Sequence, residues 1–104
     1  MQIKILTLPL VGLRIEIEKR LRALAEAAGL PTQGSLAQLT RVLADRGILE
    51  TQAVSGLRDL IALGNQAAHG RQVSTDVALS AADFASGVLQ ALDLKLAVMR
   101  KGVP

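Results

Sequence analysis

Apolar residues recur every three to four positions along most of the chain, which is the spacing of amphipathic helices. Four segments carry this pattern, and each is bounded by residues that start or stop helices: 9–28, 35–46, 51–69 and 74–100. No stretch alternates apolar and polar residues for long enough to build a sheet, and short turns join the segments. The pattern therefore predicts an all-α fold, a compact bundle of four or five helices.

The first helix is expected to begin at Pro9, because a proline fits the first turn, where its missing N–H is not needed. Gly29 and Pro31 follow in the order that ends a helix. Charges of alternating sign stand at four-residue steps, so that neighbours attract one another; they are Arg14, Glu18, Arg22 and Glu26, with Glu16 and Arg20 as a second pair. We interpret them as a solvated, salt-bridged face and not as a binding strip.

The second helix is expected to start after Ser35, which forms a capping-box signature with Gln38 three residues later. Gly47 can adopt the left-handed conformation that ends this helix, and Ile48 then lies where it can fold back onto Leu43.

The third helix is expected to run from Thr51 to His69 and to end at Gly70. Its predicted inner stripe consists of Val54, Leu57, Ile61, Gly64 and Ala68. A glycine inside a helix costs roughly 1 kcal/mol relative to alanine. We therefore expect another helix to cross closely at Gly64.

Ser74 offers a cap for a fourth helix that extends to about Arg100, where the cationic tail suits a helix C-terminus. Its inner stripe is predicted to consist of Val77, Ala81, Phe84, Val88 and Leu92. Many small residues widen the apolar face beyond this stripe. A face of that width predicts that the fourth helix is covered on two sides.

The chain has 104 residues, half of them apolar, which is enough for one domain with an ordinary core. We expect a single domain over 1–104 with its core at 9–100, while 1–8 is either a flexible entry or the boundary of a longer protein. The absence of cysteine excludes disulfides and thiol chemistry. No apolar run reaches 18 residues, so we expect no membrane span within the chain and take a cytoplasmic location as the default.

The net charge of +3 and the pI near 10.0 permit a nucleic-acid partner without requiring one. Phe84 is the only aromatic residue, so the chain lacks the platforms on which proteins stack unpaired bases. RNA binding would have to use phosphates and shape.

Candidate chemistry concentrates at the end of the third helix, where the only histidine lies. At about 100° per residue, Arg58, Asn65 and His69 share one stripe, but Arg58 is about 16 Å from His69 along the axis. Arg71 lies nearer in the sequence and is the alternative cation for binding. A purely structural role is also open, since Asn and His in a last turn satisfy free carbonyls. No metal or cofactor site is predicted.

Two segments together resemble the HEPN superfamily, in particular its branch of uncharacterised bacterial domains of unknown function. The first is Arg14-Ile-Glu-Ile-Glu-Lys-Arg-Leu21, and the second is Leu57-Arg-Asp-Leu-Ile-Ala-Leu-Gly-Asn-Gln-Ala-Ala-His-Gly70. The resemblance spans about residues 9–92. It implies a bundle of four or five helices that is frequently a homodimer.

Active members of that superfamily are metal-independent endoribonucleases whose Arg-x4-His motif lines a cleft between protomers. By this resemblance the motif histidine falls on His69, its polar residue on Asn65 and its arginine on Gly64. A glycine offers no charge to hold a phosphate, and electrostatic stabilisation is usually the largest catalytic contribution. Arg71, or Arg58 of a partner chain, would have to replace it.

Three hypotheses follow. The leading one is a non-catalytic, dimerising HEPN-like interaction domain of a bacterial protein, which binds a second copy, a partner protein or an adjacent domain. The second is a toxin-like endoribonuclease that uses His69 and Asn65 with Arg71 or Arg58. The third is RNA or nucleotide binding without turnover.

Overall fold

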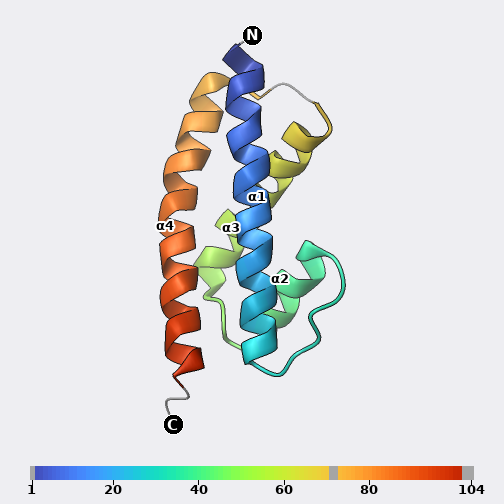
Figure 1. Ribbon diagram of the computed structural model, residues 1–104, viewed down its shortest axis with the longest axis vertical. Coiled ribbons are helices and arrows are strands. Elements are labelled where there is room, and N and C mark those ends of the chain that lie inside the picture. Colours follow the sequence, from blue (N-terminus) through green and yellow to red (C-terminus); the bar gives the residue numbers. More distant parts are fainter. Residues whose placement is uncertain (1, 71–72, 102–104) are drawn as a thin grey trace.

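The computed structural model describes residues 2–70 and 73–101, with side chains from Leu10 onward. It contains four helices: α1 (Gln2–Ala27), α2 (Leu36–Asp45), α3 (Thr51–Ala68) and α4 (Thr75–Arg100) (Figure 1). No strand occurs within the described ranges. The predicted all-α bundle is confirmed, and it has four helices.

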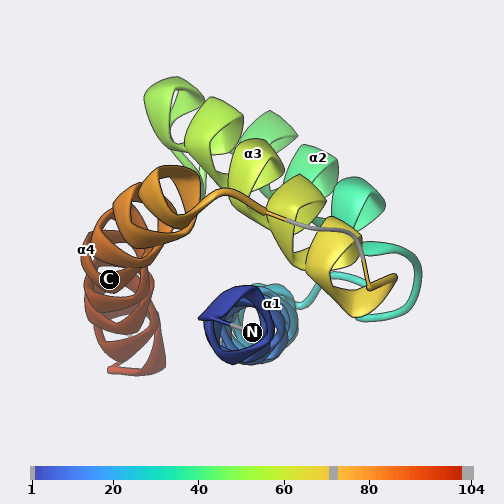
Figure 2. The same ribbon diagram turned by 90° about the horizontal axis from the view of Figure 1, so that it is seen from above.

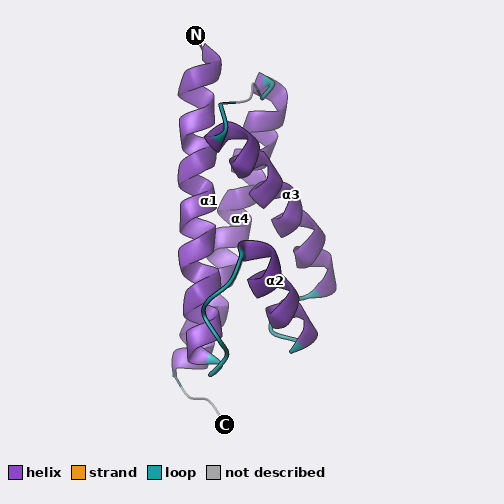
Figure 3. Ribbon diagram, turned by 90° about the vertical axis from the view of Figure 1, so that its right-hand side faces the viewer, coloured by secondary structure: helices purple, strands orange, loops and turns teal. Residues whose placement is uncertain are grey.

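The two long helices, α1 and α4, run side by side in the same direction (Figure 1). α3, which lies between them in the sequence, runs in the opposite direction. The short α2 packs beside the later half of α1 and against α3 (Figure 3). The molecule measures 50 × 24 × 19 Å. In the view along the long axis of the molecule, α3 and α4 diverge on either side of α1 (Figure 2). α1 therefore packs against both of them.

The core forms around the later half of α1. Ile17, Leu21 and Leu24 are fully buried there, and Leu43 of α2 and Leu57 of α3 close over them. Burying a side chain of this size contributes about 1.5–3 kcal/mol. These leucines therefore hold the three helices to one another.

The helix boundaries follow the local signals in the sequence. The amide N–H of Gln38 donates to the Ser35 hydroxyl over 3.1 Å, and the amide N–H of Ser35 donates to the Gln38 side chain over 3.0 Å. Ser74 caps α4 through the amide N–H of Val77. Gly47 has a φ of +72° and Gly70 a φ of +75°. Residues other than glycine rarely adopt this left-handed conformation. These predicted caps and terminators are confirmed.

The start of α1 differs from the prediction. The helix begins at Gln2 and not at Pro9. The residues before Pro9 include no glycine or second proline that would stop a helix, so one missing backbone donor does not end it.

The predicted inner stripe of α4 is wrong at two positions. Val77 is 45% exposed and Phe84 is 47% exposed, whereas Ala78, Ala81 and Ala85 are buried. Small side chains allow α1 to approach closely along this edge, and the larger residues are turned toward α3. A smaller shift occurs in α3, where Ala67 is buried in place of Ala68.

The charged residues of α1 pair as predicted, but they do not form a purely solvated face. The Arg20 guanidinium lies 2.8 Å from the Glu16 carboxylate and 2.8 Å from Asp93 on α4. The hydrogen bond from Arg20, with a smaller effect of nearby Lys19, lowers the pKa of Glu16. Glu16 and then Asp93 raise the pKa of Arg20. This cluster links α1 to α4.

We expect Arg20→Gln to raise the pKa of Glu16 toward the ordinary carboxyl range, measured by NMR titration. In the native chain the folded-state pKa lies below the unfolded one, so the stability from Glu16 is complete above the ordinary range and is lost as pH falls through the lowered value. The exposed Arg41→Gln on α2 serves as the control. An unchanged Glu16 titration in Arg20→Gln would contradict the pairing.

Candidate functional site

The crossing of α1 over α3 at Gly64 determines the geometry at the end of α3. Gly64 is buried, and a Cβ added to it would lie 2.6 Å from the Cβ of Arg14. Real Cβ atoms do not approach so closely, and the Arg14 Cβ is fixed to the α1 backbone. The predicted close crossing is confirmed, and only a glycine fits it.

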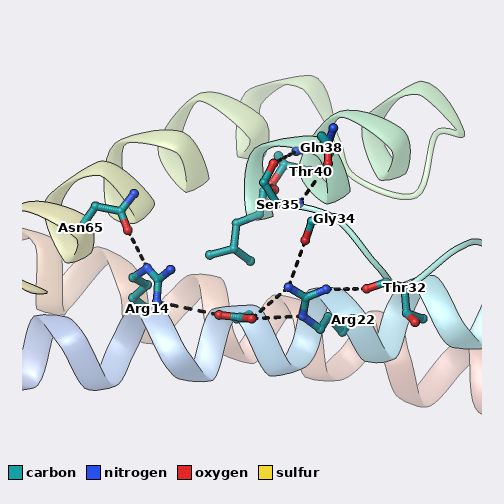
Figure 4. Close-up of polar contacts among 10 residues, drawn as sticks. Arg14, Arg22, Thr32, Gly34, Ser35, Gln38, Thr40 and Asn65 are labelled. Atoms are coloured by element: carbon teal, nitrogen blue, oxygen red, sulfur yellow. Dashed lines mark hydrogen bonds and ion pairs between the residues drawn. The ribbon is translucent and has the colours of Figure 1, made fainter.

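The same crossing brings a guanidinium to Asn65. The Nε of Arg14 donates to the Oδ1 of Asn65 over 2.6 Å, and its Nη1 lies 3.8 Å from a carboxylate oxygen of Glu18 (Figure 4). Asn65 is exposed, but its side-chain oxygen is already occupied. The Arg14–Asn65 hydrogen bond thus ties α1 to the last turns of α3.

Glu18 continues the network toward the loop between α1 and α2. It accepts two hydrogen bonds from Arg22, over 3.1 and 2.9 Å. Arg22 also donates to the carbonyl oxygen of Thr32 and, over 3.2 Å, to that of Gly34 (Figure 4). These guanidinium groups are engaged in contacts that link α1 to α3 and to the loop before α2.

His69 occupies the C-cap of α3, and its backbone N–H donates to the carbonyl oxygens of Ala67 and Asn65. Its side chain is exposed. Arg58 is exposed more than two turns earlier on α3, beside Asp45 and Asp59. Arg71 lies outside the described residues. Among the predicted site residues within the described part of the chain, Asn65 is hydrogen-bonded, and its partner Arg14 was not one of the predicted site residues.

No group of three or more potential metal ligands occurs among the described residues.

A groove runs between α3 and α4. It consists of two hollows of about 570 and 600 Å³. The Phe84 ring separates them and rests against Gly56, where a Cβ would collide with it. The first hollow, toward the start of α4, is lined mainly by Gly56, Leu60, Leu63, Val77 and Ala81, and the second by Leu49, Ala53, Gly87, Val88 and Ala91.

The rim of this groove is acidic although the chain as a whole is cationic. Asp59 and Asp76 line the first hollow, and Glu50 and Asp83 line the second. Lys95 is the only basic residue among the lining residues described. Phosphate backbones are repelled by such a rim, so the groove suits an apolar partner with positive charge.

One face of α4 is left uncovered along this groove and beyond it, toward the C-terminal end of the helix. We call it the α4 stripe; its members alternate three and four residues apart, as in a coiled coil, and are Val77, Ser80, Phe84, Gly87, Ala91, Leu94 and Val98. All seven are exposed, Leu94 by 70% and Val98 by 54%. The opposite face of α4 packs on α1. Hence α4 has two apolar faces, of which only one is covered.

With 26 residues and two apolar faces, α4 is long and apolar enough to cross a membrane by length and composition alone. Of its most apolar 18-residue stretch, 22% is buried inside the molecule. A helix covered on two sides meets the same criterion. The expectation that no span occurs within this chain stays a prediction.

No family model, curated protein or solved structure matches the chain. The resemblance to the HEPN superfamily therefore stays a prediction that rests on the residues quoted for it.

Sequence reasoning missed the groove and the Arg14–Asn65 hydrogen bond. Gly56 was the available signal for the groove, because a second glycine inside α3 marks a second close approach. Arg14 could not be assigned to Asn65 from the sequence, since 51 residues separate them.

Proposed function

We propose that this chain is a non-catalytic, HEPN-like interaction domain that forms a homodimer through the α3–α4 groove. The observation that carries the proposal is the uncovered α4 stripe. Valine, leucine and phenylalanine side chains are left in water there, and burial of apolar area drives most protein association. A second copy that covers the stripe would remove this cost for both chains at once.

The end of α3 supports a non-catalytic role. The position of the motif arginine is Gly64, which accepts no side chain, and Asn65 is engaged by Arg14. General acid–base catalysis by His69 needs a cation within reach of the same phosphate. Arg58 is too far along α3 to supply it within one chain.

We expect the native chain to sediment as a dimer at micromolar concentration. Phe84→Asp should sediment as a monomer, because a carboxylate would be buried against an apolar and already acidic surface. Leu79→Asp is the matched control: Leu79 is a 57% exposed residue of α4 outside the stripe, and its variant should stay dimeric. Circular dichroism checks that both variants keep their helices.

Two results would overturn the proposal. One is a native chain that stays monomeric at micromolar concentration. The other is metal-free cleavage of RNA by the purified chain that His69→Ala abolishes, which would establish the endoribonuclease alternative. Binding of RNA that weakens steeply with salt, without cleavage, would favour the nucleic-acid-binding alternative.

A further inference from the structure

The α4 stripe has a symmetric distribution of large and small residues about Gly87. Phe84 lies three residues before Gly87 and Ala91 four residues after it. Ser80 and Leu94 lie seven residues before and after Gly87, and Val77 and Val98 lie ten residues before and eleven after it. Each of the two layers next to Gly87 thus matches one large residue with one small residue. An antiparallel pair of α4 helices would place these partners opposite each other.

We propose that the second copy docks with its α4 antiparallel to the first, with the two-fold axis at Gly87. This inference rests on the proposed homodimer and specifies the element and register that form it. Two-fold contacts use the same surface on both chains, so a stripe that matches its own reverse satisfies both copies simultaneously.

A parallel pair would fit poorly. It would set Phe84 against Phe84, which crowds one layer, and Ala91 against Ala91, which leaves another layer underfilled. The antiparallel pair places the Phe84 ring over Ala91 and beside Gly87 of the second copy. At Gly87, where no atom lies within 4 Å of an added Cβ, the surface is open to a close neighbour.

The charges of α4 favour the same direction. Asp76 and Asp83 stand in its first half. Lys95 stands in its second half and Lys101 directly follows the helix, while Asp93 of the second half is already paired with Arg20 of α1. In the antiparallel register, Lys101 of the second copy lies about 4.5 Å from Asp76 along the axis. Lys95 of the second copy reaches the level of Ser80, which lines the same hollow as Asp59. A parallel pair would instead place like charges together.

The absence of cysteine from the chain allows a direct test by disulfide cross-linking. Under mild oxidation, Gly87→Cys should form a covalent dimer, because the two sulfur atoms meet at the axis within the short span that a disulfide bridges. Val98→Cys alone should stay uncross-linked, and so should Val77→Cys alone. The double variant Val77→Cys/Val98→Cys should cross-link in two places.

A second measurement avoids the stripe itself. Spin labels at the exposed positions Leu79 and Gln90, attached one at a time as cysteine variants, report the distance between the two copies. The antiparallel register separates the pair of labels at 79 by about 24 Å along the axis and the pair at 90 by about 9 Å. A parallel pair would give two similar short distances.

The outcomes separate the inference from the proposed function. Efficient cross-linking of Val98→Cys alone, or equal label distances at 79 and 90, would overturn the antiparallel pairing and leave the homodimer standing. A dimer in which no α4 position cross-links would also overturn it, since the interface would then lie elsewhere. A chain that is monomeric in sedimentation would remove the homodimer itself.

Discussion

Replacing Leu21 with alanine is expected to lower the free energy of unfolding by about 2–5 kcal/mol, the largest effect of any single change considered for this chain. Leu21 is 0% exposed and stands in the later half of α1, the helix that touches all three others. Its removal leaves a cavity among side chains that are fixed by three different helices, so the site cannot collapse easily. A domain of this size has only about 5–15 kcal/mol of total stability.

Urea denaturation monitored by circular dichroism measures this change. The control is Leu79→Ala on α4, where the same side chain is 57% exposed, and it should stay within about 0.5 kcal/mol of the native chain. Similar losses for the two variants would mean that Leu21 is not a core residue.

Replacing Gly64 with alanine is expected to lower the free energy of unfolding by about 1–3 kcal/mol. In an open helix the same change would raise it, because alanine is the better helix former by about 1 kcal/mol. The sign reverses here because the new methyl group meets the Cβ of Arg14 at 2.6 Å, and the α1 backbone must shift to make room.

Gly12→Ala provides the matched control. Gly12 also lies inside a helix, α1, but no atom lies within 4 Å of an added Cβ. It should therefore stabilise the chain by up to about 1 kcal/mol. Thermal unfolding of the two variants should move in opposite directions, and a gain in stability for both would show that α1 and α3 do not cross closely.

The close crossing also bears on the HEPN-like motif. An arginine at position 64 would need the space that α1 occupies, so Gly64→Arg would separate α1 from α3 before it could restore an Arg-x4-His site. For this chain the glycine is a requirement of packing. Under the proposed HEPN resemblance, the absence of an arginine at position 64 and the position of α1 are two aspects of one arrangement.

Features encoded over a few residues were predictable from the sequence. The capping box at Ser35 and the terminating glycines at 47 and 70 were identified because each depends on the conformation of its own neighbours. The close approach at Gly64 was also predicted, since an interior glycine needs a compensating contact. The identity of the partner, Arg14, was not.

Features that depend on tertiary packing were predicted less well. The apolar face of α4 is so wide that periodicity alone could not decide which edge meets α1, and the edge with small residues allows the closer approach. Likewise, the spacing of Arg14, Arg20 and Arg22 predicts pairing within α1, but it contains no information about Asn65, Asp93 or the loop that they reach. Long side chains extend beyond the helix on which their spacing is defined.

The parallel course of α1 and α4 has a mechanical consequence. α1 starts at one end of the 50 Å molecule and α4 finishes at the other (Figure 1). Tension applied between these two ends would slide the helices past each other along their full length, so that their contacts resist the load together. A hairpin of antiparallel helices, pulled from its adjacent ends, would open one layer at a time. The parallel pair therefore resists extension through all of its α1–α4 contacts at once.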